Sequence, residues 1–148
     1  LKVDINDIFK ENLLKKNSFD AVVMNPPYKE VGRGKTNENE NKLIARHEVK
    51  ATLTDFISTA SQLLKDKGEL YLVHKPERIV DIMNEMRKFK IEPKEMRLVY
   101  PYKNEAPSIV LIKGVKSGKK FFSVEKPLII YEPNGEYTQE IREIYSEN

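Results

Sequence analysis

The chain has 148 residues and a mass of 17.2 kDa, which is enough for one domain with a modest core. It has no cysteine and two histidines, His47 and His74, which excludes disulfides, zinc–thiolate sites, cysteine nucleophiles and histidine-rich metal sites. The net charge of +3 does not by itself indicate a nucleic-acid partner. No window reaches the roughly 18 apolar residues of a membrane span and no secretory signal is present, so we expect a cytoplasmic protein without a membrane partner.

The first predicted elements are a weak strand over Leu1–Ile5 and a short helix or loop over residues 7–18. Phe19–Met24 follows, and the continuous apolar run Ala21–Met24 within it suits a strand of a parallel sheet that is buried on both faces. Asn25-Pro26-Pro27 must end this strand, because proline cannot donate to a ladder and restricts the residue before it.

Residues 29–41 are polar and contain two glycines, which predicts a long mobile loop that is poorly ordered without RNA. A helical period then runs from Leu43 to Leu64, and Gly68 lies where a helix-ending glycine is expected. Glu69–His74 is a second buried strand, and Pro76 starts the next helix, whose apolar stripe comprises Ile79, Ile82, Met83 and Met86.

The last third of the chain is predicted to contain mostly strands. Met96–Tyr100 and Ser108–Lys113 could form an antiparallel pair, followed by a short strand over Leu128–Tyr131 and a terminal helix over Tyr137–Tyr145. The alternation of strands and helices predicts the α/β fold class, with a mainly parallel sheet.

Asn25-Pro26-Pro27-Tyr28 carries the sharpest chemical signal, because ligands bind beyond the carboxyl ends of strands in an open α/β sheet. The prolines fix the directions of the Asn25 side chain and the Pro26 carbonyl, which together offer two acceptors to a planar exocyclic amine. Holding both amine hydrogens out of plane reduces conjugation of the nitrogen lone pair and exposes it to an electrophile. Tyr28 supplies a face on which a flipped-out base can stack.

This tetrapeptide resembles the catalytic motif of class I S-adenosylmethionine-dependent methyltransferases acting on planar amines or amides. Asn37-Glu38-Asn39-Glu40, Ala45-Arg46-His47-Glu48 and the run from Leu72 to Arg78 resemble the bacterial tRNA adenine-N6 methyltransferases, which act on the adenine beside the anticodon of a valine tRNA. The resemblance implies a Rossmann-like sheet, S-adenosylmethionine as cofactor and tRNA as partner, with Asn25, Pro26, Pro27 and Tyr28 as the catalytic residues.

The resemblance also implies that Asp7, Ile8 and Asn25 contact the cofactor. The glycine-rich loop and the ribose-binding acid of the family have no counterpart in these 148 residues. We therefore expect residues 1–148 to be one partial domain, the C-terminal catalytic half of the methyltransferase sheet, with residues 121–148 as a small extension. Such a chain should bind the cofactor weakly and self-associate through the unpaired edge of Phe19–Met24.

Two basic segments are candidate nucleic-acid contacts. The segment after Tyr28 would form a flexible lid that contacts RNA through Lys29, Arg33, Lys35, Arg46 and His47, although a solvated polar loop remains the alternative. A denser basic stretch could contact phosphates or be a solvated turn, and it comprises Lys113, Lys116, Lys119, Lys120 and Lys126. His74, at the end of a strand, is interpreted as a hydrogen-bonded structural residue and not as a base.

The functional prediction is methylation of an exocyclic adenine amine in tRNA, by the parent protein if not by this chain alone. The same tetrapeptide also suits DNA, rRNA or protein-glutamine methyltransferases, and the chain could instead be an inactive fragment or a binding module. No residue pattern indicates a metal site.

Overall fold

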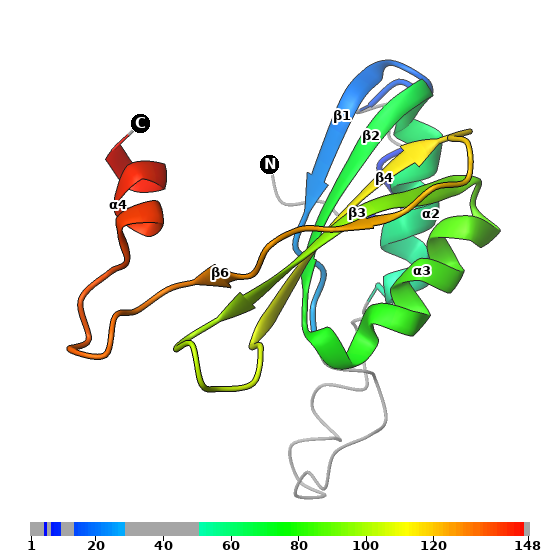
Figure 1. The fold of residues 1–148 in the computed structure, drawn as a ribbon. Coiled ribbons are helices and arrows are strands. Elements are labelled where there is room, and N and C mark those ends of the chain that lie inside the picture. The colour runs from blue at the N-terminus through cyan, green and yellow to red at the C-terminus, as the bar shows by residue number, and fades with distance from the viewer. Residues whose placement is uncertain (1–4, 6, 10–13, 29–50, 147–148) are drawn as a thin grey trace, which may run out of the picture.

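The computed structural model describes residues 5, 7–9, 14–28 and 51–146. Its sheet has the strand order β1-β2-β4-β3-β5, and β6 also pairs with β3 (Figure 1). β1 runs parallel to β2, whereas β4 runs antiparallel to both β2 and β3, which confirms the α/β class and the predicted antiparallel pair. The elements are β1 (Phe19–Met24), α2 (Leu53–Leu63), β2 (Leu64–His74), η1 (Pro76–Arg78), α3 (Ile79–Lys88), β3 (Ile91–Tyr100), β4 (Ile109–Lys116), β5 (Ser123–Val124), β6 (Leu128–Ile129) and α4 (Gln139–Ser146).

Helices α2 and α3 lie on the same side of the sheet (Figure 1), and the main core lies between them and the strands. Thr52 is the N-cap of α2 and forms a capping box with Asp55. The Thr52 hydroxyl accepts from the Asp55 amide at 3.3 Å, and the Asp55 carboxylate accepts from the Thr52 amide at 2.7 Å. The buried core side chains are Ile57, Ala60, Leu64, Leu70, Leu72, Ile82, Met86, Ile91, Val110 and Ile112.

The contact between α3 and the sheet depends on Gly114 of β4. A Cβ at this position would lie 2.1 Å from Cε of Met86 and 2.7 Å from Cγ2 of Ile91. A glycine is therefore required for α3 to pack this closely on the sheet.

The prediction that β1 is buried on both faces is wrong. Val22 and Met24 pack against the core, but the alternate residue Val23 is 74% exposed. The reason is that α2 and α3 lie on one face only, so the residues of β1 alternate between a covered and an open face. β1 also pairs with β2 alone among the described residues, so it is an edge strand, as expected.

Several element boundaries differ from the predicted ones. β2 begins at Leu64, five residues before the predicted Glu69, and the left-handed residue after α2 is Lys67 (φ 63°), not Gly68. β3 begins at Ile91 and includes Pro93, which is accommodated at a register shift between Pro93 and Glu95.

Residues 121–146 return along the free edge of β3. β5 and β6 both pair with β3 in parallel, and Ile141 of α4 packs with Val99 and Leu128 in a second, smaller core. Whether residues 121–148 form a separate extension stays a prediction. Among the residues that the structure describes, no helix is long and apolar enough to cross a membrane.

Candidate methyl-acceptor site

The Asn25–Tyr28 turn lies at the carboxyl edge of two parallel strands. β1 ends at Met24, which pairs with Leu72, so the turn follows beside the last residues of β2. The Pro26 side chain is fully buried, whereas Asn25, Pro27 and Tyr28 are exposed. Pro26 therefore anchors a turn whose other three side chains face solvent.

Tyr28 and Asn25 contact each other across this turn. The Tyr28 hydroxyl donates a 2.8 Å hydrogen bond to Oδ1 of Asn25. A carboxamide oxygen has two lone pairs, so Oδ1 keeps one for an incoming donor. The bond fixes the direction of the Asn25 side chain before any ligand arrives.

His74, the last residue of β2, supports the Asn25–Tyr28 turn. Its side chain is 1% exposed, and Nδ1 accepts a 2.8 Å hydrogen bond from the Lys75 amide. The other ring nitrogen therefore carries the proton and donates to the backbone of Pro27, which can only accept through its carbonyl. Burial lowers the pKa of His74 below its ordinary value of 6.5, and the nearby charge of Arg78 lowers it further. A neutral, fully bonded His74 agrees with the structural role expected from the sequence.

The Tyr28 ring is held by two neighbours from the end of β2. The His74 ring meets it edge-on, with the centroids 5.0 Å apart and the planes at 75°. The Lys75 ammonium lies 5.7 Å from the Tyr28 ring centroid, within cation–π distance. Tyr28 remains 40% exposed. The contribution of Lys75 was missed in the sequence, although its position directly after His74 in a parallel neighbour strand was the available signal.

The remaining predicted site residues are not brought into this cluster. Asp7 and Ile8 are half-buried, and Asp7 has an interaction partner. The five predicted RNA-contacting residues lie outside the described residues, as does the loop expected to be mobile; they are Lys29, Arg33, Lys35, Arg46 and His47. Within the described part of the chain, no group of three or more histidine, aspartate or glutamate side chains could hold a metal ion.

The predicted basic stretch of residues 113–126 does not form one surface. Lys113 pairs with Glu69 at 2.8 Å, and Lys126 lies 3.9 Å from Glu140. Lys116 donates to the carbonyls of Ser61 and Leu64 at 2.6 and 2.7 Å, so it closes the C-terminal end of α2. Lys119 and Lys120 are the members of the stretch that remain exposed without an ion pair to a described residue.

Comparison with known proteins assigns the chain to a methylase family. Residues 2–106 match the model of the Eco57I restriction-modification methylases, and the chain belongs to this family. It is similar to the crystal structure of a predicted O-methyltransferase, Atu636 from Agrobacterium tumefaciens, with a TM-score of 0.72 and 20% identity over 99% of this chain and 58% of that one.

A second similar structure is TTHA0409 from Thermus thermophilus, provisionally assigned as a DNA modification methylase, in complex with S-adenosylmethionine. Its TM-score is 0.54, with 18% identity over 95% of this chain and 56% of that one. At such identities these structures establish the fold, which is that of class I methyltransferases. The chain spans less than three fifths of the length of either protein. No curated protein matches the chain.

The cofactor predicted from the sequence agrees with these findings, since the family consists of methylases that use S-adenosylmethionine. The described residues offer a polar contact that suits S-adenosylmethionine. The exposed carboxamide of Asn25 at the end of β1 can bond a polar group of the cofactor or of the methyl acceptor.

Proposed function

We propose that this chain carries the methyl-acceptor site of an S-adenosylmethionine-dependent methyltransferase that modifies the exocyclic amine of adenine in tRNA. The observation that carries the proposal is the Asn25–Tyr28 turn, which His74 and the buried Pro26 hold at the carboxyl edge of β1. A site that must orient one planar amine benefits from acceptors that are fixed in advance.

The two N–H groups of the amine bond to Oδ1 of Asn25 and to the Pro26 carbonyl. Held in this way, the nitrogen lone pair conjugates less with the ring and points toward the methyl group. Tyr28 stacks on the flipped-out base with the face that its neighbours leave exposed. S-adenosylmethionine, when bound, supplies the electrophilic methyl group. The amine proton is lost easily once the nitrogen has become cationic, so no strong base is needed, in keeping with a neutral His74.

Asp7, Ile8 and Asn25 are the proposed cofactor contacts within this chain. The Asp7 carboxylate can accept a hydrogen bond from the adenine amine of the cofactor, and Ile8 can pack on its ring. Calorimetry tests the role of Asp7 by comparing the affinity for S-adenosylmethionine of Asp7→Ala, which removes the acceptor, and of the unchanged whole protein. An equal affinity would remove Asp7 from the site.

DNA is the second candidate acceptor, and the description of the matched family as restriction-modification methylases favours it. A panel of tRNA, rRNA, duplex DNA and a glutamine-containing protein, each incubated with radiolabelled S-adenosylmethionine, distinguishes the acceptors. Label in tRNA supports the first proposal, and label in DNA alone supports the second. Label in no acceptor would indicate an inactive fragment or a binding module.

We also propose that residues 1–148 form the catalytic half of the methyltransferase sheet and self-associate through β1. One edge of this strand has no partner among the described residues, and its Val23 side chain is exposed. Sedimentation of the 148-residue chain tests this. Val23→Lys should shift a dimer toward the monomer, because a charge on an edge strand opposes pairing. A monomer at all concentrations would contradict the proposal.

A further inference from the structure

The end of the sheet opposite the Asn25–Tyr28 turn gathers four segments that lie far apart in the sequence. The Ser117 amide donates to the Lys90 carbonyl at 2.8 Å, and Lys67 donates to the Ser117 carbonyl. Lys94 donates to the Lys119 carbonyl at 3.0 Å, and Lys116 donates to Oδ1 of Asn17 at 2.9 Å. We call this surface the basic pole, and it consists of residues 15–20, 65–68, 85–94 and 116–120.

The basic pole has a higher positive charge than the whole chain, because the rest of the chain is negatively charged on balance. It holds eleven lysine and arginine side chains and four carboxylates, whereas the whole chain has a net charge of only +3. Three carboxylates are already paired: Asp20 with Lys65 at 2.8 Å, Glu92 with Arg87 at 2.7 Å and Glu85 with Lys88 at 3.5 Å. Asp66 is the fourth. The remaining lysines therefore greatly outnumber the acidic groups that the described residues offer them.

Two of these lysines stand in backbone conformations that favour glycine. Lys67 has φ 63° after α2, and Lys90 has φ 61° directly beyond the C-cap of α3, where helices usually have glycine. A side chain kept at such a position despite its unfavourable backbone is a reason to look for a function. Both side chains are exposed. In both cases the retained feature is a lysine side chain, which adds a positive charge at this end of the sheet.

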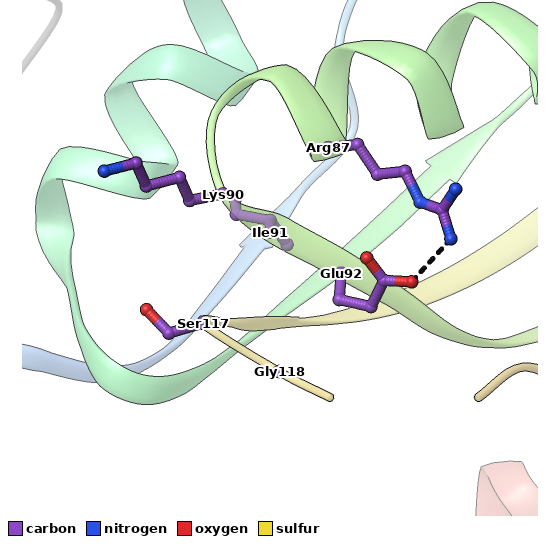
Figure 2. A pocket seen from close by; sticks show the side chains of 6 residues that line it. All are labelled: Arg87, Lys90, Ile91, Glu92, Ser117 and Gly118. Atoms are coloured by element: carbon purple, nitrogen blue, oxygen red, sulfur yellow. Dashed lines mark hydrogen bonds and ion pairs between the residues drawn. The ribbon is translucent and has the colours of Figure 1, made fainter. Parts of the chain in front are cut away.

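Lys90 also lines a pocket of about 290 Å³, whose walls are Arg87, Lys90, Ile91, Glu92, Ser117 and Gly118. Figure 2 shows the Lys90 and Ser117 side chains on one side of the pocket and the Arg87–Glu92 ion pair on the other. The one carboxylate in the pocket is thus engaged by Arg87. A phosphate-sized anion on the opposite side would meet the Lys90 ammonium and the Ser117 hydroxyl, which can both donate to it.

We propose that the basic pole is a second binding surface, which holds the phosphate backbone of a nucleic acid. The cations are spread over four segments of the chain, and this arrangement matches a repeating polyanion better than one small anion. Residues 69–74 of β2 separate the basic pole from the Asn25–Tyr28 turn, a distance of about 20 Å at ~3.3 Å per residue. A bound duplex would need about six base pairs to reach from one surface to the other. The proposal goes beyond the proposed function, because phosphate binding here requires no methyl transfer.

The test is the salt dependence of binding between the 148-residue chain and a fluorescein-labelled 30-base-pair duplex, followed by anisotropy. The informative variant is the double substitution Lys67→Gly with Lys90→Gly. Glycine suits both left-handed positions, so this variant should unfold at the same temperature as the unchanged chain or higher. Its log–log slope of affinity against salt should be smaller by about 2, since each lost phosphate contact removes about 1. Affinity at 0.1 M salt should fall about tenfold.

Asn17→Gly provides the matched control, because Asn17 is also left-handed (φ 51°) at the basic pole but carries no charge. This control should keep the salt slope of the unchanged chain. A double lysine variant that keeps this slope, or an unchanged chain that does not bind the duplex at all, would overturn the proposal. If the duplex binds as described but no acceptor is methylated by the whole protein, the proposed function is wrong, and the proposal that the basic pole binds nucleic acid is still supported.

Discussion

The hydroxyl of Tyr28 bonds to Oδ1 of Asn25 at 2.8 Å, so the stacking residue and the amine acceptor of the proposed site are linked. This link offers two ways in which Tyr28 could act. Its ring could stack on the base, or its hydroxyl could orient Asn25.

Substitutions of Tyr28 separate these two roles. Tyr28→Phe keeps the ring and loses the hydroxyl, whereas Tyr28→Ala loses both. Stacking of a base on an aromatic ring is worth about 1–3 kcal/mol, so we expect single-turnover methylation to fall roughly 5- to 150-fold in Tyr28→Ala and far less in Tyr28→Phe. Equal losses in both variants would assign the effect to the hydroxyl.

Asn25→Ala removes one of the two proposed amine acceptors. We expect methylation by the whole protein to be abolished while its affinity for the nucleic acid, measured by anisotropy, changes little, because Asn25 acts mainly on the reacting nitrogen. Val23 lies two residues earlier and is 74% exposed, so Val23→Ala is a nearby control for general disturbance of this region. Turnover near the original level in Asn25→Ala would exclude the proposed role.

Acid should destabilise the protein through His74. Its pKa in the folded chain is below 6.5, the ordinary value expected in the unfolded chain. Between these two values the unfolded state binds more protons, so stability falls as the pH drops through 6.5 toward the folded pKa, with no contribution from this group above 6.5. Melting temperatures between pH 8 and pH 5 should fall less steeply in His74→Gln than in the unchanged chain. Parallel profiles would show that His74 is not the titrating group.

The packing of α3 on the sheet gives a prediction about stability alone. Gly114→Ala introduces a Cβ that meets Met86 and Ile91, so we expect a loss of about 1–3 kcal/mol in the free energy of unfolding. Met86→Ala creates space next to the new methyl group, so the double variant should lose less than the sum of the single losses. Urea denaturation of the three variants measures this coupling. Additive losses would mean that Met86 does not limit the space at Gly114.

The sequence was a good guide where local chemistry decides the structure. The two prolines after Met24 end β1 in any context, and the strand periods of β2, β3 and β4 located the sheet. Exposure of Val23 could not be predicted, because it depends on which face of the sheet the helices cover. The left-handed turn at Lys67 was assigned to Gly68, since composition alone favours glycine at such a position.

The sequence also could not predict which partners the charged side chains contact. Lys113 and Lys116 are neighbours in a basic stretch, yet one pairs with Glu69 and the other closes the end of α2. Lys67 and Lys90, which are far apart in the chain, instead lie at one end of the sheet. Such groupings depend on the pairing of strands that are distant in sequence, which a local pattern does not contain.

The chemical identity of the methylated atom tests the account most directly. The whole protein would be incubated with radiolabelled S-adenosylmethionine and the tRNA and DNA acceptors, and the labelled nucleic acid would be digested to nucleosides and separated. We predict that the label is found on the exocyclic nitrogen of adenine and is absent when Asn25 is replaced by alanine. Label on a ring nitrogen, a carbon or a ribose oxygen, or equal label with Asn25→Ala, would contradict the proposed amine site.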